Sequence, residues 1–460
     1  MEQTLLKIMN AINTYMADYV LIVLLVAVGL FFTIKTRFVQ VRCFGEGMKK
    51  VFGNFTMKGK KEKSGMSSFQ ALATAIAGQV GTGNIVGASG AILLGGPGAI
   101  FWMWVIAFLG MATIYAEAVL AQETRTVDKD GTVHGGPIYY IKYAFKGKFG
   151  TFLAGFFAIA TVISLGFIGG MVQSNSIGAT FNTAFNIPTW VAGLVIAAIV
   201  SFIVIGGASR VAATTEKMVP IMATLYLVGC IVVLALNVTK LPEAIGMIFK
   251  YAFQPQAIIG GGFGAALKMA ISQGAKRGLF SNEAGMGSTP HAHAMANVEK
   301  PHDQGVVAMI GVFIDTFIVL TMTALVVISC LYAGNGPLAS GAAEGINKTN
   351  MAQLSFSSAF GDGIGNAYVA ICLMFFALST IISWNLFGKI NFNYLFGKKS
   401  TIVYSIISVV FVFLGSIVKE NELVWVTQDT FNQFMVLPNA IALFALYKIV
   451  VKTSKKNKKQ

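Results

Sequence analysis

Two glycine-rich segments interrupt long apolar runs of this 460-residue chain, and both have the composition of a binding site. They are residues 78–84 (Gly-Gln-Val-Gly-Thr-Gly-Asn) and residues 274–283 (Gly-Ala-Lys-Arg-Gly-Leu-Phe-Ser-Asn-Glu). An interrupted helix in hydrocarbon leaves backbone groups without partners, so it is tolerated only where it is buried in protein or lines a cavity. Freed carbonyl groups can bind a cation, and freed N–H groups at the start of a half-helix can bind an anion. Two such breaks predict a transport site near the middle of a membrane.

At the first break, hydrogen-bond donors and acceptors of the backbone and of side chains lie within eight residues. The predicted groups are the N–H groups of Thr82 and Gly83 for a carboxylate, the carbonyl groups of Ala77 and Val80 for Na⁺, and the side-chain amides of Gln79 and Asn84. The alternative is that the glycines serve close helix packing. Gly78, Gly81 and Gly83 lie too close together for that pattern, which favours a binding site.

The second break is predicted to hold the other end of a zwitterion. A half-helix that ends at residues 274–278 would expose carbonyl groups to an ammonium group. Phe280 is a predicted wall for a small side chain, and Ser281 and Asn282 are predicted polar contacts. Since an unpaired charge inside a membrane is costly, we expect Lys276, Arg277 and Glu283 to form an internal ion pair.

The composition is that of an integral membrane protein. Hydrophobic residues make up 55% of the chain and charged residues 12%, about half the charged fraction of a soluble domain. The net charge of +15 comes from basic residues in short loops between apolar runs, which argues against nucleic-acid binding and for a topology signal. The four cysteines form no disulfide pattern. His291, His293 and His302 lack metal-ligand spacing and are interpreted as loop histidines rather than a metal site.

The elements that position the two breaks are eleven predicted membrane spans in one transporter domain, residues 1–460. They cover residues 17–34, 67–95 (broken), 97–121, 150–178, 189–208, 216–238, 257–296 (broken), 303–330, 363–387, 401–418 and 423–447. Alternate loops and the tail hold 28 of the 34 basic residues, which predicts an N-terminus outside and a cytoplasmic C-terminus. Acidic residues precede the first span, so it is not a cleavable signal.

These spans divide into one extra N-terminal helix (17–34), a first repeat (67–238), a second repeat (257–447) and a basic cytoplasmic tail (448–460). The broken helix is then the first member of each group of five. Because five is odd, the second group enters the membrane from the opposite side. The predicted fold is therefore an all-α membrane protein of eleven transmembrane helices with a 5+5 inverted repeat.

Several longer motifs resemble the alanine/glycine:cation symporter family over residues 15–450. They are Gly81-Thr82-Gly83-Asn84-Ile85, Gly95-Gly96-Pro97-Gly98-Ala99-Ile100-Phe101-Trp102-Met103-Trp104, Tyr115-Ala116-Glu117-Ala118, Gly135-Gly136-Pro137 and the run from Gly278 to Ser288. The resemblance implies the leucine-transporter-type fold with one extra N-terminal helix. It also implies sodium-driven uptake of a small neutral amino acid.

Two further spans are expected to complete the pocket. Gln173 lies among glycines of the fourth span, where its amide serves either an interhelical hydrogen bond or, as the resemblance favours, the substrate. In the ninth span, the resemblance assigns the Phe376 carbonyl group and the Ser379 and Thr380 hydroxyl groups to Na⁺, and Trp384 to the substrate wall. The alternative for the hydroxyl groups is a bond to their own helix. Thr380 is also expected to reach the substrate.

Two acidic residues within spans are interpreted as structural. Asp315 is either a salt-bridge partner of Lys268, which we favour, or a coupling carboxylate. Glu117 is expected to pair with Arg125 nearby in sequence. Both interpretations rest on the cost of an isolated charge in the membrane.

The resulting hypothesis is a sodium-coupled symporter, not an enzyme, that imports alanine or glycine across a bacterial-type cell (plasma) membrane by alternating access. Na⁺ is the coupling ion, no organic cofactor is expected, and one chain is expected to suffice.

The alternatives are proton coupling on the same fold, or glutamine as main substrate. Proton coupling would place a lysine at the sodium site, and Lys217 lies too shallow for that. A membrane enzyme would need clustered acidic or histidine residues at a membrane face, and a channel would need a repeated pore segment.

Overall fold

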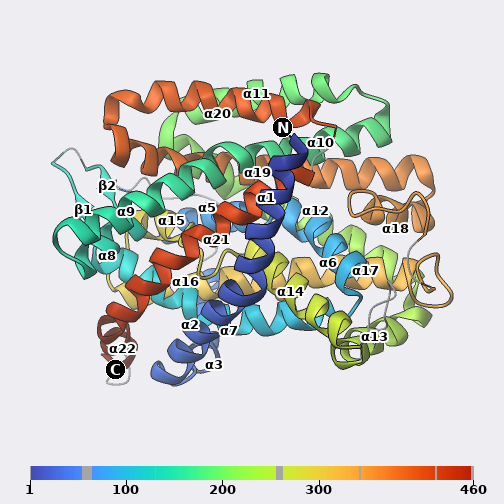
Figure 1. Cartoon of the computed structure of the whole chain (residues 1–460), viewed down its shortest axis with the longest axis horizontal. Coiled ribbons are helices and arrows are strands. Elements are labelled where there is room, and N and C mark those ends of the chain that lie inside the picture. Colours follow the sequence, from blue (N-terminus) through green and yellow to red (C-terminus); the bar gives the residue numbers. More distant parts are fainter. Residues whose placement is uncertain are drawn as a thin grey trace.

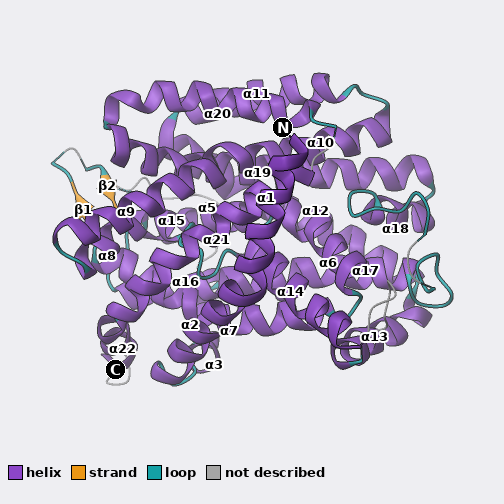
Figure 2. Ribbon diagram, viewed as in Figure 1, coloured by secondary structure: helices purple, strands orange, loops and turns teal. Residues whose placement is uncertain are grey.

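The computed structural model describes residues 2–53, 65–129, 131–254, 263–340, 343–419 and 422–456. Nearly all of these residues are helical (Figure 2). The departure from an all-α fold within the described residues is one antiparallel pair of short strands, β1 (Thr126–Val127) and β2 (Val133–His134). The start of the predicted seventh span, residues 257–262, and the end of the tail, residues 457–460, lie outside the described residues.

The helices follow one another along the chain with the labels of Figure 1. Those of the first half are α1 (Glu2–Tyr15), α2 (Ile22–Lys35), α3 (Val39–Arg42), α4 (Phe44–Phe52), α5 (Ser68–Gln79), α6 (Ala88–Gly95), α7 (Ala99–Glu123), α8 (Pro137–Ala144), α9 (Gly147–Thr161), α10 (Gly169–Phe185), α11 (Thr189–Ile205) and α12 (Gly207–Leu236). Those of the second half are α13 (Leu241–Phe253), α14 (Phe263–Asn282), α15 (Pro290–Met295), α16 (Pro301–Val312), α17 (Thr321–Leu331), α18 (Met351–Phe360), α19 (Asp362–Phe396), α20 (Thr401–Ile417), α21 (Glu422–Ala445) and α22 (Tyr447–Lys456). Short π-helical segments continue several of them, at Met16–Leu21, Gly83–Gly87, Val162–Ile168 and Phe313–Leu320.

Several continuous helices are long and apolar enough to cross a membrane. By length and composition, seven qualify among the described residues, and α21 with α22, bent by 61°, would make an eighth. The seven are Thr4–Lys35, Ala99–Glu123, Gly147–Phe185, Gly207–Leu236, Pro301–Leu331, Asp362–Phe396 and Lys398–Ile417. The half-helix Gly83–Gly95 and helix α11 are apolar but shorter. The count of eleven spans and the inverted repeat stay predictions.

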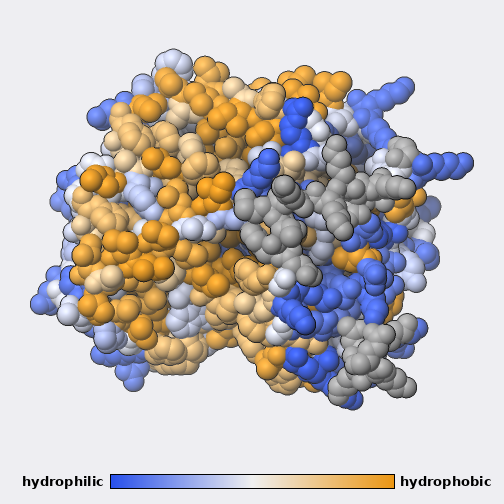
Figure 3. Space-filling view, turned by 180° about the vertical axis from the view of Figure 1, so that it is seen from behind, coloured by the Kyte–Doolittle hydropathy of each residue, from blue (hydrophilic) through white to orange (hydrophobic). Residues whose placement is uncertain are grey.

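The outer surface has the hydropathy of a membrane protein. In Figure 3 a broad apolar region covers most of the face, and hydrophilic residues gather at one edge. That edge is the end of the molecule that carries β1, β2, α8 and α22, at the left in Figure 1. We call it the hairpin end. The opposite end carries α13 and α18, and we call it the α18 end.

The first broken helix lies in the interior, as predicted. Helix α5 begins with a capping box at Ser67 and ends at Gln79. Residues 80 and 81 leave the helical path, and the π-helical segment Gly83–Gly87 leads into α6. Helix α19 packs against α5, α10 and α12, so the break faces α19, a helix of 35 residues.

The second break lies elsewhere than predicted. Helix α14 runs without interruption through residues 274–278 to Asn282, and the non-helical segment is residues 283–289. Gly274 is small for packing: a Cβ atom there would lie 2.6 Å from Trp102 Cβ and 2.8 Å from the Ala99 carbonyl oxygen of α7. The turn itself has positive φ angles at Glu283 (58°), Gly285 (92°) and Gly287 (80°). The predicted ammonium site at 274–278 is therefore wrong, because those carbonyl groups belong to a continuous helix.

Candidate functional site

The first break frees two backbone carbonyl groups because side chains take their helical partners. In a continuous helix, Ala77 O would accept from Gly81 N–H and Gly78 O from Thr82 N–H. Instead, Gly81 N–H donates to Asn84 Oδ1 (2.9 Å) and Thr82 N–H donates to Gln173 Oε1 (3.0 Å). The carbonyl groups of Ala77 and Gly78 are thereby left for other partners.

The freed carbonyl groups meet two hydroxyl groups of α19. Thr380 Oγ1 lies 2.9 Å from Ala77 O, 3.4 Å from Gly78 O and 3.1 Å from Phe376 O. Ser379 Oγ lies 3.3 Å from Ala77 O and 2.8 Å from Phe376 O. All five oxygen atoms belong to buried residues, and the carbonyl groups of Ala77 and Gly78 depend on the two hydroxyl groups for donors. An all-oxygen group of this kind suits a hard cation.

This oxygen group brings together four of the five predicted sodium ligands: Ala77, Phe376, Ser379 and Thr380. Val80, the fifth, lies in the break, and its N–H still donates to Ile76 O (2.7 Å). Gly78 joins the group although it was not among the predicted ligands. The absence of a side chain at Gly81 allows the approach, because a Cβ atom there would lie 2.3 Å from Thr380 Oγ1.

Thr82 and Gln173 connect the first break to α10. Besides the backbone bond, Thr82 Oγ1 donates to Gln173 Oε1 at 2.6 Å, and both residues are buried. One amide oxygen thus satisfies the backbone N–H of Thr82, which was predicted to receive a carboxylate, and the hydroxyl group of the same residue. Both donors of Thr82 are therefore occupied by Gln173 in this structure.

Three aromatic rings lie beside the first break, near the start of its second half-helix at Gly83. The Phe280 ring lies edge-on to Trp384, with centroids 5.8 Å apart, and 5.2 Å from the Trp425 ring. A Cβ atom at Gly83 would lie 2.9 Å from Phe280 Cδ1. The lack of a side chain at Gly83 therefore lets the backbone of the first break approach the Phe280 ring.

Asp315 joins the two breaks through hydrogen bonds. Its carboxylate accepts from Asn84 Nδ2 (2.7 Å), from Ser281 Oγ (2.9 Å to Oδ2) and from Thr316 Oγ1 (2.9 Å). Asp315 is fully buried, whereas Lys268 is exposed and lies over the Tyr19 ring. The favoured pair between Asp315 and Lys268 is therefore wrong, because the two side chains lie in different environments.

Gln79 and Asn282 form a second link between the breaks. Gln79 Nε2 donates to the Asn282 backbone carbonyl at 2.7 Å, where α14 ends. The Gln79 Oε1 atom is buried and has no hydrogen-bond partner among the described residues. It is thus a buried acceptor without a partner among the described residues, on a side chain that contacts the end of α14.

Arg277 and Glu283 of the predicted second break have partners other than each other. Arg277 forms an ion pair with Asp429 of α21, with Nη2 and Oδ2 2.7 Å apart. Glu283 accepts hydrogen bonds from Trp384 Nε1 and Ser288 Oγ. The predicted ion pair among Lys276, Arg277 and Glu283 is wrong, since Arg277 and Glu283 have other partners.

Glu117 also has partners that lie far away in sequence. It accepts from Asn439 Nδ2 (2.6 Å) and from Gly285 N–H (3.2 Å), so it holds the second turn against α21. Arg125 instead donates to the Ala294 carbonyl group at 3.1 Å. The predicted pair between Glu117 and Arg125 is wrong, because the acid faces the protein interior and the base faces the end of α15.

The histidines are buried in helices, not in loops. His291 and His293 lie on α15 and His302 on α16, each at most 1% exposed. Their ring nitrogens lie within hydrogen-bond distance of Asn391, Gln304 and Tyr115, respectively. These contacts fasten α15 and α16 to neighbouring helices.

Beside Phe280 lies a group of residues that the sequence pattern did not assign to the site. Trp425 and Asp429 project from α21, and Lys348 Nζ lies 4.3 Å from the centroid of the Trp425 ring. The Arg277–Asp429 pair lies beside them. A signal was present in the sequence: Trp425, Asp429, Asn432 and Asn439 place polar groups at helical spacing in an otherwise apolar span.

Comparison with known proteins places the chain in a family. Residues 2–460 match the model of the sodium:alanine symporter family. The chain is 38% identical over 454 residues to the sodium/alanine symporter AgcS of Methanococcus maripaludis, covering 98% of this chain and 96% of that protein. It is 37% identical over 451 residues to the probable sodium/glutamine symporter GlnT of Bacillus subtilis, covering 98% and 90%.

A solved structure supports the fold. The crystal structure of MhsT in complex with L-phenylalanine superimposes with a TM-score of 0.58 and 14% identity, covering 84% of this chain and 99% of that one. At this identity the likeness concerns the fold alone, which is of the leucine-transporter type. With the family match over the whole length, it follows that this chain is a multi-pass membrane transporter, not an enzyme, and belongs to the sodium:alanine symporter family.

Proposed function

We propose that this protein is a sodium-coupled symporter that imports a small neutral amino acid, alanine or glycine, by alternating access. The observation that carries the proposal is the group of five oxygen atoms where α19 meets the first break. It joins the end of a half-helix, α5, to α19 through contacts that a Na⁺ ion would strengthen. Sodium binding would then favour one arrangement of the two elements over another.

The amino acid would lie between the two breaks. Its carboxylate would take the Thr82 N–H group from Gln173 and use the Gly83 N–H group beside it, and its ammonium group would face Gln79 Oε1 and the carbonyl groups at the end of α14. Phe280 and Trp384 would limit the side chain, with Asn84, Ser281 and Thr380 around it. These residues are buried, so the substrate would be bound away from water.

Sodium is favoured over a proton by the surroundings of the oxygen group. Proton coupling through a lysine would need an ammonium group among these oxygens, but Lys217 of α12 is exposed. A second route to proton coupling runs through Asp315. It is a buried carboxylate between the breaks, and it could carry a proton or contribute to a second cation site.

The substrate is proposed from the size of the site. The name of the relative GlnT makes glutamine the second candidate. Each methylene group changes binding in a pocket by about 1–3 kcal/mol. The Phe280 ring close to the backbone at Gly83, backed by the rings of Trp384 and Trp425, favours the smaller amino acids.

The membrane orientation is proposed from the basic residues. Arg125, Lys142, Lys146 and Lys398 lie at the hairpin end, which the positive-inside rule places in the cytoplasm. Lys276 and Arg277 must be removed from the predicted loop count, since they lie within α14, but the asymmetry persists. The N-terminus would lie outside a bacterial-type cell membrane, and all proposed site residues come from one chain, so a monomer would suffice.

The proposal is tested by uptake of radiolabelled amino acids into proteoliposomes. We expect L-alanine or glycine uptake to require an inward Na⁺ gradient, with glutamine slower. Uptake driven by a proton gradient without Na⁺ would contradict sodium coupling. Uptake of glutamine in preference to both small amino acids would contradict the proposed substrate and leave sodium coupling standing.

Substituting Gly81 by alanine tests the contact between the break and α19. The new Cβ atom would lie 2.3 Å from Thr380 Oγ1, so the break must move away. Overpacking of this kind costs about 1–3 kcal/mol, which corresponds to a loss of Na⁺ affinity of roughly 5- to 150-fold. The measurement is the Na⁺ concentration for half-maximal alanine uptake.

Gly155→Ala is the matched control for Gly81→Ala. Gly155 lies in α9, and a Cβ atom there meets nothing within 4 Å. We expect its transport to equal that of the unmodified protein. Normal Na⁺ dependence in a well-folded Gly81→Ala protein would contradict the placement of the sodium site at this contact.

A further inference from the structure

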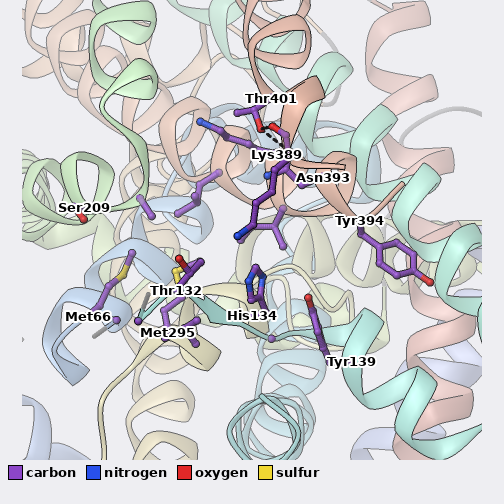
Figure 4. Close-up of a pocket in the computed structure, with 18 of the residues that line it drawn as sticks. Met66, Thr132, His134, Tyr139, Ser209, Met295, Lys389, Asn393, Tyr394 and Thr401 are labelled. Carbon is purple, nitrogen blue, oxygen red and sulfur yellow. Dashed lines mark hydrogen bonds between the residues drawn. The ribbon is translucent and has the colours of Figure 1, made fainter. Parts of the chain in front are cut away.

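A large cavity at the hairpin end is lined by a lysine, Lys389, that takes part in none of the interactions described so far. Its volume is about 780 Å³, which is ample for a small amino acid. The cavity is lined by the segment before α5, by the β1–β2 hairpin, by the end of α15 and by the last turns of α19. Figure 4 shows the Lys389 side chain extending from α19 into this space, toward His134.

Lys389 is half-buried in the cavity wall, and its ammonium group forms no hydrogen bond or ion pair with the described residues. Asp128, a carboxylate in contact with two lining residues, is already engaged. Its Oδ2 atom is 2.9 Å from His134 Nε2 and 3.4 Å from Lys398 Nζ. None of the described lining residues is acidic. The described lining of the cavity therefore carries an excess of positive charge, and walls of low polarity strengthen its field.

The cavity also continues the proposed transport path. On α19, Lys389 follows Thr380 by nine residues, which places it about 14 Å further toward the hairpin end. Met66, just before α5, and Met295, at the end of α15, line the same space. Met66 N–H donates to Met295 O and Asn297 N–H donates to Met66 O, both at 2.8 Å. These bonds join the ends of the two broken helices beside the cavity, so separation of the half-helices would open it toward the proposed site.

We propose that this cavity is a second, weaker binding site for a carboxylate, with Lys389 as its anion-binding group. Its ligand would be the α-carboxylate of the amino acid as it passes between the central site and the cytoplasm. The identity of the ligand rests on the proposed function, whereas the preference for an anion rests on the cavity alone. A substrate that leaves Thr82 and Gly83 would thus exchange backbone N–H groups for an ammonium group.

The anion preference can be tested without transport, by measuring the reactivity of lysine side chains. The purified protein is treated with an amine-modifying reagent, and modification of each lysine is followed by mass spectrometry. We expect propionate to slow modification of Lys389 at least threefold, and its neutral analogue propionamide to leave the rate unchanged. Lys452 is exposed on α22 and serves as internal control, with an unchanged rate in both solutions.

Other anions separate the possible sources of the ligand. Protection by inorganic phosphate at lower concentrations than propionate would overturn a carboxylate site in favour of a phosphate site. Equal protection by chloride, or no protection by propionate, would overturn the proposal altogether. Each of these results stands whether or not the protein transports alanine, so failure of this site and failure of the proposed function are distinguishable.

A transport measurement then tests the place of the cavity on the path. In inside-out vesicles, where the hairpin end faces the medium, K389Q should raise the alanine concentration for half-maximal transport about tenfold. K389R should restore most of the affinity, because it keeps the charge, and K452Q should behave as the unmodified protein. A K389Q protein with unchanged half-saturation on this side would overturn the cavity as a substrate site.

Discussion

Replacing Thr380 by alanine is expected to raise the Na⁺ concentration for half-maximal alanine uptake by roughly 10- to 100-fold. Thr380 Oγ1 is the atom that lies within 3.4 Å of three carbonyl oxygens, on both the first break and α19. Loss of a group that binds a charged partner costs about 1.5–3 kcal/mol, and each 1.4 kcal/mol is a factor of about ten. The measurement is uptake into proteoliposomes at a series of Na⁺ concentrations.

The matched control for Thr380→Ala is Thr161→Ala. Thr161 is equally buried, and its hydroxyl group bonds to Phe157 O of its own helix, α9. The Thr161→Ala substitution removes the same atoms from a membrane helix without altering a residue near the break. The Na⁺ dependence of this variant should therefore stay normal. If Thr380→Ala folds and keeps normal Na⁺ dependence, the sodium site lies elsewhere.

Replacing Asp315 by asparagine is expected to reduce alanine uptake at least 30-fold. The carboxylate accepts hydrogen bonds from Asn84, Ser281 and Thr316. In asparagine an NH₂ group replaces one carboxylate oxygen, so a donor would face donors and at least one of these hydrogen bonds would be lost. Truncating one partner of a buried, hydrogen-bonded charge costs about 2–5 kcal/mol. The loss would fall on transport because Asp315 joins the two breaks, which must keep their relative positions to bind one substrate.

The Asp315→Asn protein also discriminates between the coupling ions. If alanine uptake by this variant still depends on Na⁺ but is no longer stimulated by external acid, the Asp315 carboxylate binds a coupling proton. Loss of Na⁺ dependence would place it near a sodium ion. Asp303→Asn is the control, since Asp303 pairs with Lys50 outside the core, and it should transport normally. Normal uptake by Asp315→Asn would contradict its role in joining the breaks.

Prediction from the sequence succeeded where a local pattern determines the backbone. Three glycines within six residues of an apolar run, together with Asn84, identify the first break, because Asn84 supplies the acceptor that replaces a helical carbonyl group. The hydroxyl pair of α19 followed from the family resemblance, and the structure places it against the predicted carbonyl groups of Ala77 and Phe376. Its role in binding Na⁺ stays a prediction.

Prediction failed where glycine has two possible uses. The sequence pattern indicates Gly274 and Gly278 as helix breakers, but Gly274 lies against Trp102 and Ala99 of α7, where a side chain would not fit. The true turn is marked by Gly285 and Gly287, which have positive φ angles. Both pairs look alike in one sequence, because the neighbouring helix that distinguishes them is far away along the chain.

Charge pairing failed for a similar reason. Arg277 and Asp429 are 152 residues apart, and Glu117 and Asn439 are 322 apart. Buried charges in a membrane protein need partners, but any helix of the bundle can supply them. A rule that pairs neighbours in sequence works for exposed helix faces and fails in a core assembled from distant helices.

The most direct test of sodium-coupled transport is to measure both fluxes in the same proteoliposomes. Labelled L-alanine and ²²Na⁺ are followed together, with and without the other solute. We predict that alanine accelerates ²²Na⁺ influx, that removal of Na⁺ abolishes alanine influx, and that Thr380→Ala weakens both effects together. Alanine influx that is unchanged in the absence of Na⁺, with no alanine-dependent ²²Na⁺ flux, would contradict sodium-coupled transport.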